Sequence, residues 1–455
     1  MNFNPSIFRA YDIRGIAYKD LSEELVTSLG KALGTMILES DQDYINVGRD
    51  GRISSPKMFE WLSQGIISTG CNVTNLGVVP TPLLYFSTHK LASNNGVVIT
   101  GSHNPSEFNG FKIVIKNRTL SGKEIQNIKK IMEKEDFAVG KGVKEDKDIV
   151  EMYLKEITEN ISLKKKLKVV IDCGNGATSI LAKDCYERLG CEVIDLHCKL
   201  DGNFPNHHPD PSKPENLKDL IEQVLLSKAA VGIAFDGDGD RLGVVDPEGE
   251  IIFPDMQMIL FSKEVLKKRQ GSKIVFDVKC SKLLPESINQ NGGVPVISKT
   301  GHSFIKNKIK EVSAALGGEM SGHIFFNDRW PGFDDALYAG ARLLEILSST
   351  NEGQNVFNLL PKLTSTPEIN VPAKDEEKFL FVEKFKSLIN FPDAEIIEID
   401  GVRVEFKYGW GLLRASNTSP LLVLRFEAIN KEKLEEIKEQ FRKVLAKVGP
   451  NLIGF

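Results

Sequence analysis

Short apolar runs alternate with longer amphipathic stretches over most of the chain. Apolar runs of strand length that are bounded by Gly or Asp predict buried strands, and the stretches between them predict helices. The unit strand, helix, strand, helix, strand occurs three times. The strands it predicts are 44–47, 70–73 and 96–100, then 168–172, 190–193 and 232–235, then 273–277, 293–296 and 316–318. These units predict an α/β protein with three tandem βαβ-type domains and mixed, mainly parallel sheets.

The pattern changes near Leu363, where the alternation of strands and helices stops. Short strands and one long amphipathic helix follow, which predicts a C-terminal α+β domain with an antiparallel sheet. The predicted strands are 394–399, 402–406, 411–415 and 421–428, and the predicted helix is 431–448. Charged residues dominate 129–148, between the first two copies. We therefore predict four domains, at residues 1–147, 148–250, 251–362 and 363–455.

The composition narrows the classes of protein that fit this pattern. A chain of 455 residues that is 41% hydrophobic can form several cores, which excludes a disordered protein. The net charge of -4 gives no general attraction to nucleic acid or to an anionic membrane, so we expect neither as a partner. We find no membrane-spanning apolar run and no secretory leader. The six cysteines form no C-x-x-C pair, so neither a zinc ribbon nor a thioredoxin motif is indicated. Without an export signal, we expect free thiols and a cytoplasmic location.

Each of the three copies ends in a polar loop, after which a further strand begins. The strands expected after the loops are 111–115, 241–245 and 323–326. Ligands collect at the carboxyl ends of strands in parallel sheets, so these loops indicate one composite site. The loops are 100–105 (Thr-Gly-Ser-His-Asn-Pro), 236–241 (Asp-Gly-Asp-Gly-Asp-Arg) and 318–323 (Gly-Glu-Met-Ser-Gly-His).

The first loop holds Ser102 between Gly101 and His103, and two interpretations remain open. One is a polar turn, because Gly101 and Pro105 both favour turns. The other is an exposed serine nucleophile. The G-x-S-x-G elbow of many hydrolases is absent, and adjacency in sequence does not guarantee that His103 faces Ser102.

The second loop places three carboxylates, those of Asp236, Asp238 and Asp240, at alternating positions. Their mutual repulsion favours a divalent cation, and oxygen ligands suit Mg²⁺. An EF-hand would need Gly and Glu where this chain has Arg241 and Pro247. The alternative is a solvated acidic turn.

Two further loops offer groups that bind sugars and phosphates. Glu319, Ser321 and His323 can hydrogen-bond to vicinal sugar hydroxyls. The segment 414–420 (Arg-Ala-Ser-Asn-Thr-Ser-Pro) offers a guanidinium, hydroxyls and backbone N–H groups, which can hold a phosphate without a metal. A Walker P-loop sequence is absent. Ordinary polar turns remain the alternative for both.

Taken together, these loops resemble the α-D-phosphohexomutase superfamily, and most closely its bacterial phosphomannomutase/phosphoglucomutase members. The resemblance covers essentially the whole chain, and the motifs occur in the family's order. They are 8–15 (Phe-Arg-Ala-Tyr-Asp-Ile-Arg-Gly), 47–52 (Val-Gly-Arg-Asp-Gly-Arg), 100–105, 236–241, 318–323 and 414–418.

The resemblance implies four domains around a central cleft, which carry the phosphoserine, metal-binding, sugar-binding and phosphate-binding loops in that order. The implied catalytic residues are Ser102, Arg14, Lys112 and His302. The implied metal ligands are Ser102, Asp236, Asp238 and Asp240. The implied substrate-binding residues are Tyr11, Arg241, Lys279, Glu319, Ser321, His323, Arg414, Ser416, Asn417, Thr418 and Arg425. The general base stays open among Lys112, Arg14 and His302.

The reaction implied by the resemblance is reversible transfer of a phosphoryl group between C1 and C6 of mannose and glucose phosphates. It would pass through phosphoserine and a hexose 1,6-bisphosphate, with Mg²⁺ as cofactor. The expected partners are small hexose phosphates. We expect a monomer, with a dimer as the alternative.

Other functions compete with this one. A phosphoglucosamine mutase typically has Ala where this chain has Gly101 and Gln where it has Met320, so both positions favour a hexose substrate. A phosphatase would transfer the phosphoryl group to water and would not need a fourth domain for a second phosphate. A non-catalytic sensor is disfavoured because the serine and all three aspartates are present.

Overall fold

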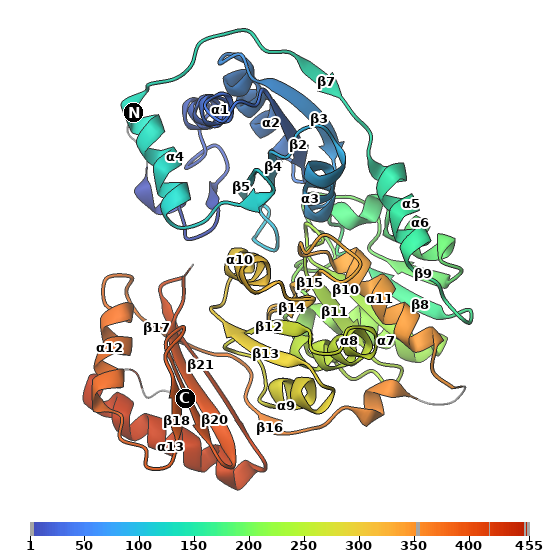
Figure 1. Ribbon diagram of the computed structural model, residues 1–455, viewed down its shortest axis with the longest axis vertical. Helices are drawn as coiled ribbons and strands as arrows, with labels where there is room; N and C mark the ends of the chain where they lie inside the picture. The colour runs from blue at the N-terminus through green and yellow to red at the C-terminus, as the bar shows by residue number, and fades with distance from the viewer. Residues whose placement is uncertain (1–3, 352–354, 418, 450–451, 453–455) are drawn as a thin grey trace.

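The computed structural model describes residues 4–351, 355–417, 419–449 and 452. These residues form four β-sheets that follow one another along the chain, each flanked by helices (Figure 1). The first three sheets are mixed and, taken together, mainly parallel, whereas the fourth is antiparallel. The α/β fold class predicted from the sequence is confirmed.

The first sheet has the order β1-β5-β4-β2-β3-β7, and β6 pairs with β5. Its strands β4, β2, β3 and β7 are parallel neighbours, and apolar side chains such as Ile45 and Val47 fill its core. The strands are β1 (Ile13–Ile16), β2 (Tyr44–Arg49), β3 (Asn72–Val78), β4 (Gly96–Ile99), β5 (Phe108–Ile115), β6 (Arg118–Thr119) and β7 (Lys144–Asp146). The helices are η1 (Pro5–Ile7), α1 (Glu23–Leu38), α2 (Ser55–Ile67), α3 (Thr81–Lys90) and α4 (Lys123–Lys134).

The charged stretch 129–148 belongs to this first sheet. It completes α4 and then returns as β7, which pairs with β3 in parallel. Thr74 on β3 donates to Glu145 at 3.1 Å, and Asn75 donates to Asp146 at 2.7 Å. The charges of β7 are exposed, because the strand lies at the edge of the sheet.

Helices α1 and α2 approach each other closely because glycines face each other between them. A Cβ atom on Gly30 would lie 2.2 Å from the carbonyl oxygen of Leu62, and one on Gly65 would lie 2.1 Å from that of Thr27. These distances are far shorter than any normal carbon–oxygen contact, so only glycine fits here.

The replacement Gly30→Ala is therefore expected to lower the free energy of unfolding by about 1–3 kcal/mol, because the helices must separate to admit the methyl group. Urea unfolding measures the change. The control is Gly449→Ala, where a Cβ would have 3.4 Å to its nearest neighbour, and we expect it to alter stability by less than about 0.5 kcal/mol. Equal stability of the two variants would contradict the prediction.

The second and third sheets have the orders β11-β10-β8-β9 and β13-β12-β14-β15. The strands are β8 (Lys168–Asp172), β9 (Glu192–Leu196), β10 (Val231–Phe235), β11 (Leu242–Val245), β12 (Lys273–Asp277), β13 (Val294–Ser298), β14 (Leu316–Gly318) and β15 (Ile324–Phe326). The helices are α5 (Val150–Asn160), η2 (Ala177–Ile180), α6 (Ala182–Arg188), η3 (Pro214–Leu217), α7 (Lys218–Ser227), α8 (Pro254–Lys268), α9 (Leu283–Gln290), α10 (His302–Val312), α11 (Ala336–Ser348) and η4 (Val356–Leu359).

These two sheets share one hydrophobic core, which the sequence repeat does not reveal. Helix α11 contacts β10 and β11 of the second sheet and β15 of the third. Helix α3 of the first domain adds Phe86, whose ring stacks on that of Trp330 with centroids 5.9 Å apart. The first three units are therefore packed against one another.

The fourth sheet has the order β16-β21-β20-β19-β18, with β17 also paired to β21. Its strands are β16 (Thr364–Ser365), β17 (Ile369–Pro372), β18 (Glu395–Ile397), β19 (Val402–Phe406), β20 (Gly409–Ala415) and β21 (Leu421–Ala428). Helices α12 (Lys378–Leu388) and α13 (Lys431–Val448) pack on it, and Phe441 of α13 is fully buried. Among the described residues, no helix is both long and apolar enough to cross a bilayer.

In each of the first three sheets the predicted polar loop is the turn of an antiparallel hairpin. The hairpins are β4–β5, β10–β11 and β14–β15, which confirms the strands expected after the loops. A bridge between Arg241 and His323 joins the second turn to the third. The loops therefore converge on one place, at the carboxyl ends of the parallel strands.

Candidate active site

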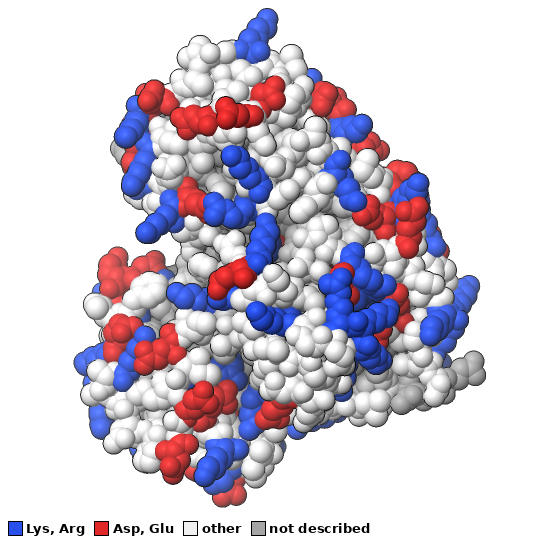
Figure 2. All heavy atoms as spheres, viewed as in Figure 1, with Lys and Arg blue, Asp and Glu red and all other residues white. Residues whose placement is uncertain are grey.

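The three turns and the fourth sheet surround a cleft of about 790 Å³. Figure 2 shows a hollow between the first and fourth domains, and both signs of charge are spread over the surrounding face. Lysine and arginine outnumber aspartate and glutamate among the lining residues. The predicted residues that line the cleft are Tyr11, Arg14, Ser102, Lys112, Arg241, Lys279, His302, Glu319, Ser321, His323, Arg414, Ser416, Asn417 and Arg425.

Ser102 lies at the floor of this cleft with its side chain almost fully buried. Its Oγ donates to Asp236 Oδ2 at 2.9 Å and lies 3.1 Å from His103 Nδ1. Its φ of 50° is in the left-handed region, which costs a serine about 1–3 kcal/mol. The backbone N–H of Ser102 donates to Thr100 Oγ1 at 2.8 Å, which helps to hold this conformation.

Arg52 holds the serine loop in place from beneath. Its guanidinium donates to the carbonyl oxygens of Ser102 and Asn104 at 2.7 Å, of Pro105 at 2.6 Å and of Phe108 at 3.1 Å. Its charge is balanced by Asp50, at 3.1 Å from its Nε. A Cβ atom on Gly101 would lie 2.5 Å from this guanidinium. The close approach of Arg52 thus requires glycine at position 101.

The replacement Arg52→Met is expected to lower kcat by about 100-fold, because it frees the loop that positions Ser102. The KM should change little, since Arg52 does not line the cleft. Arg52→Lys keeps the charge but cannot span four carbonyls, so its kcat should be intermediate. Steady-state kinetics measure both values.

The matched control is Arg342→Met. Arg342 is equally buried and pairs with Asp328 at 2.8 Å, outside the cleft. We expect this variant to lose stability but to retain kcat. A similar fall of kcat in both variants would show that Arg52 acts through stability alone.

Asp236, Asp238 and Asp240 are completely buried behind Ser102, and their oxygens lie within 4.8 Å of one another. Lys112 Nζ donates to Asp238 at 2.7 Å and to Asp240 at 2.5 Å. The Oδ1 atoms of Asp238 and Asp240 are buried and accept no hydrogen bond from the described residues. Burial, together with Asp238 and Asp240, raises the pKa of Asp236 well above its ordinary range. The unused oxygens are ligands of the kind that a divalent cation requires, and such a cation would offset the repulsion among the three carboxylates.

Two cations of the first domain lie beside the serine. Burial opposes the charge on Lys112, but the neighbouring Asp238 and Asp240 outweigh it and raise the pKa of the ammonium group. Arg14 donates to Asn104 at 2.8 Å and pairs with Asp12 at 2.5 Å. Lys112 is therefore charged in this arrangement, and Arg14 is tied to the serine loop through Asn104.

The imidazoles of His302 and His323 stack with centroids 5.5 Å apart. Asp334 Oδ2 lies 3.0 Å from His323 Nδ1 and 3.6 Å from His302 Nδ1. Burial, followed by the charge of Lys306, lowers the pKa of His302 well below its ordinary value, so its ring is neutral. Neither of its ring nitrogens hydrogen-bonds to a described residue.

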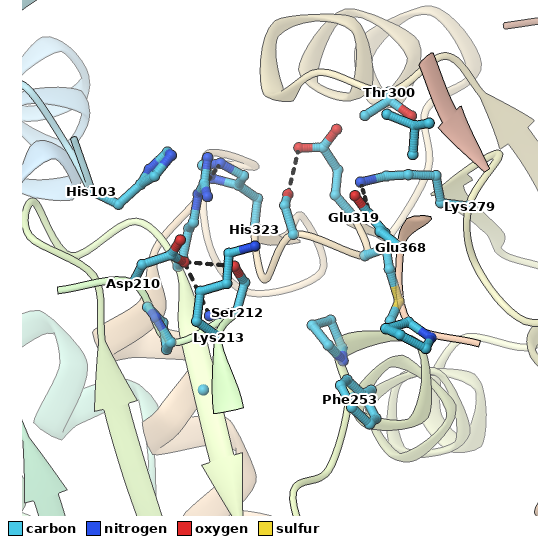
Figure 3. A pocket seen from close by; sticks show the side chains of 18 of the residues that line it. His103, Asp210, Ser212, Lys213, Phe253, Lys279, Thr300, Glu319, His323 and Glu368 are labelled. Carbon is cyan, nitrogen blue, oxygen red and sulfur yellow. Dashed lines mark hydrogen bonds and ion pairs between the residues drawn. The ribbon is translucent and has the colours of Figure 1, made fainter. Parts of the chain in front are cut away.

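Glu319 of the sugar loop lies across the cleft from the serine loop, whereas His323 lies beside Asp240. In the close-up, His103 and Asp210 lie on one side, and Glu319, Lys279 and Glu368 lie on the other (Figure 3). Glu319 accepts from the backbone N–H of Gly301, and Ser321 Oγ lies 3.4 Å from Glu319 Oε2. Lys279 pairs with Glu368 of the fourth domain at 2.6 Å.

The fourth domain presents Arg414, Ser416 and Asn417 to the cleft, whereas Thr418 lies outside the described residues. Arg414 pairs with Asp400 at 3.0 Å. Arg425 donates to the carbonyl oxygen of Lys279 at 2.5 Å and pairs with Asp255 at 3.2 Å, so it also joins the third and fourth domains. 

Several residues around the site were missed by the sequence analysis. The structure adds Arg52 as the support of the serine loop and Asp334 as the carboxylate beside both imidazoles, and it shows that His103, whose orientation the sequence left open, contacts Ser102. Arg52 lies within the motif 47–52, which was the only signal for it. Asp334 lies beside a second aspartate in Phe-Asp-Asp, and nothing in the sequence relates it to His302.

Comparisons with known proteins agree with this architecture. Family models of phosphoglucomutase/phosphomannomutase match alpha/beta/alpha domain I at residues 5–139, domain II at 151–249, domain III at 253–365 and the C-terminal domain at 368–444. A phosphomannomutase/phosphoglucomutase of Pseudomonas aeruginosa is 50% identical, over 98% of this chain and 97% of that protein. A phosphoglucomutase of Neisseria gonorrhoeae is 47% identical, over 98% of each. The crystal structure of a phosphoglucomutase/phosphomannomutase family protein from Burkholderia thailandensis is 43% identical, covers 99% of each chain and superposes with a TM-score of 0.95.

The fold and these matches confirm the resemblance to the α-D-phosphohexomutases, an enzyme class of four domains around a cleft. The chain belongs to the phosphoglucomutase/phosphomannomutase family, and it is an isomerase.

Proposed function

We propose that the protein moves a phosphoryl group between C1 and C6 of glucose and mannose phosphates, through phosphorylated Ser102 and a hexose 1,6-bisphosphate. One observation carries the proposal. Ser102 Oγ lies 2.9 Å from a buried carboxylate cluster at one side of the cleft, and Arg414 and Ser416 of the fourth domain line the same cleft. Ser102 can transfer one phosphoryl group while Arg414 and Ser416 hold the second phosphate.

We assign the binding of Mg²⁺ to Ser102, Asp236, Asp238 and Asp240. The unused buried oxygens of Asp238 and Asp240 support this assignment. When bound, the ion would supply positive charge to the phosphoryl group and its bridging oxygen. Lys112 would then be released from part of its pairing with the aspartates and could reach the phosphoryl oxygens.

Arg14 and Lys112 stabilise the negative charge that develops during transfer. Both line the same cleft as Ser102, and the pKa of the Lys112 ammonium group is raised. Electrostatic stabilisation of this kind is the main contribution a protein makes to phosphoryl transfer.

His302 is the group we assign to removal of the proton from the attacking sugar hydroxyl. Its ring is neutral and neither nitrogen hydrogen-bonds to a described residue, so the ring can accept a proton, whereas the raised pKa of Lys112 and the permanent charge of Arg14 make them poor bases. Glu319, Ser321 and His323 would orient the sugar hydroxyls, with Tyr11, Arg241 and Lys279 around them.

The fourth domain holds the phosphate that is not reacting. Arg414, Ser416 and Asn417 would bind it through charge and hydrogen bonds, which suit phosphate in either orientation of the sugar. The bisphosphate must turn over in the cleft so that each end can meet Ser102 in succession. Thr418 and Arg425 complete this proposed site.

The evidence against a hexosamine substrate now rests on one position. The close approach of Arg52 accounts for Gly101, so this glycine says nothing about the substrate. Met320 lines the cleft and still favours a hexose.

The test is a coupled assay of glucose 6-phosphate formed from glucose 1-phosphate, with Mg²⁺ and a trace of glucose 1,6-bisphosphate. Mannose 1-phosphate is tested in parallel, and we expect turnover of both. Turnover of glucosamine phosphates alone would indicate a phosphoglucosamine mutase. Release of inorganic phosphate as the main product would indicate a phosphatase and overturn the proposal.

A further inference from the structure

Two cysteines of the second domain lie next to each other, and the proposed mechanism uses neither. Cys173 follows β8 and Cys198 follows β9, at the same ends of two neighbouring parallel strands (Figure 1). The backbone N–H of Cys173 donates to the carbonyl oxygen of Leu196 at 3.2 Å, which fixes the two strand ends together. The two Sγ atoms are 3.1 Å apart. The S–S bond of a disulfide is about 2.05 Å long, so a shift of about 1 Å would bring the two sulfur atoms to bonding distance.

We propose that Cys173 and Cys198 form a reversible disulfide when the protein meets hydrogen peroxide, and that this bond slows turnover. Cys198 reacts first, because it is partly exposed whereas Cys173 is fully buried.

The disulfide forms in two steps. The sulfur of Cys198 attacks one peroxide oxygen, the O–O bond breaks, and the other oxygen leaves as water with the thiol proton. This step oxidises Cys198 to a sulfenic acid. The sulfur of Cys173 then attacks the sulfenic sulfur, and the hydroxyl leaves as a second water with the Cys173 proton. The two sulfurs together supply the two electrons that reduce the peroxide.

The segment after Cys198 connects this pair to the serine loop. Gly202 packs so closely on the first domain that a Cβ there would lie 2.5 Å from the carbonyl oxygen of Gly51. The ring of Phe204 lies 5.0 Å from the Arg52 guanidinium, which supports four carbonyls of the serine loop. A shift at Cys198 therefore acts on Arg52.

The segment after Cys173 leads to the aspartate loop. The carbonyl oxygen of Cys173 accepts from Gly176 at 2.7 Å, and Ala177 donates to the carbonyl oxygen of Gly237 at 2.9 Å. Gly237 lies between Asp236 and Asp238. Both halves of the disulfide thus reach groups that surround Ser102. Since a misplacement of about 1 Å at reacting groups can cost about 100-fold in rate, we expect kcat to fall by about tenfold.

The first measurement is made on the full-length protein after hydrogen peroxide treatment, by alkylation of thiols in denaturant and peptide mass mapping. We expect the six thiols to fall by two, with a cross-linked peptide pair that contains Cys173 and Cys198. An unchanged thiol count, or a link between other cysteines, would overturn the disulfide. This readout does not depend on mutase activity, so its failure is distinct from failure of the proposed function.

The second measurement is the activity, and this part rests on the proposed function. Wild-type protein should lose activity on peroxide treatment and regain it with a reducing dithiol. Cys198→Ala and Cys173→Ala should keep their activity, whereas Cys191→Ala, a control for a buried cysteine of the same domain, should behave as wild type. Complete cross-linking without a change in kcat, or equal loss in Cys198→Ala, would overturn the effect on turnover.

Discussion

Replacing Ser102 with alanine should lower kcat by about 10,000-fold or more, because it removes the hydroxyl that we propose carries the phosphoryl between the two ends of the sugar. The replacement removes the Oγ that now contacts Asp236 and His103. The residual rate would come from binding and charge stabilisation alone. The coupled assay with glucose 1-phosphate measures this loss.

The control for Ser102→Ala is Ser63→Ala. Ser63 is buried in α2, its hydroxyl has no hydrogen-bond partner among the described residues, and it does not line the cleft. We expect this variant to keep wild-type activity. Incubation with labelled glucose 1,6-bisphosphate, followed by denaturation, should leave label on wild type but not on Ser102→Ala. Retained turnover or retained label in Ser102→Ala would refute the role of this serine.

Loss of one carboxylate from the buried cluster should cause the second largest fall in kcat, after loss of Ser102. Asp238→Asn is expected to lower kcat by about 100-fold to 1,000-fold at a fixed Mg²⁺ concentration, because it weakens the cation site at the developing negative charge. The variant should also need more Mg²⁺ for half of its maximal rate. A chelator should abolish wild-type activity, and added Mg²⁺ should restore it.

The matched control is Asp246→Asn. Asp246 is buried in the same domain and accepts hydrogen bonds from the backbone of a turn, away from the cleft. Its Mg²⁺ dependence should equal that of wild type, as titration of the rate with Mg²⁺ will show. Full activity in the presence of chelator, or an unaltered Mg²⁺ requirement in Asp238→Asn, would rule out the cluster as a metal site.

Much of the fold could be predicted because its signals are local. The apolar runs 168–172 and 273–277 are strands in the structure with the same bounds, and the long C-terminal helix is also as predicted. Strand 70–73 begins two residues later, at Asn72, because Gly70 adopts a positive φ that belongs to the preceding turn. The small strands β16 and β17 were not predicted, since their pairing with β21 determines them more than their own residues do.

The residues of the candidate site likewise include some that the sequence predicts and some that it does not. The polar loops could be recognised from the sequence because each is a short run of residues that directly follows a predicted strand. The contacts of Arg52 with the serine loop could not, because they span about 50 positions and depend on how the first sheet folds. The same holds for Asp334, whose neighbour His302 is the first residue of α10 and whose partner His323 lies in the turn of the β14–β15 hairpin.

By itself, the sequence determined the order of strands and helices, the change of architecture near Leu363, and which loops carry a serine, three aspartates and phosphate-binding groups. The reason is that periodicity and loop composition are properties of neighbouring residues. Only the tertiary structure decided which of these groups meet, that the second and third sheets share a core, and which side chains are charged. Protonation depends on burial and on distances between charges, so the charged Lys112 and the neutral His302 could be distinguished only once the domains were assembled.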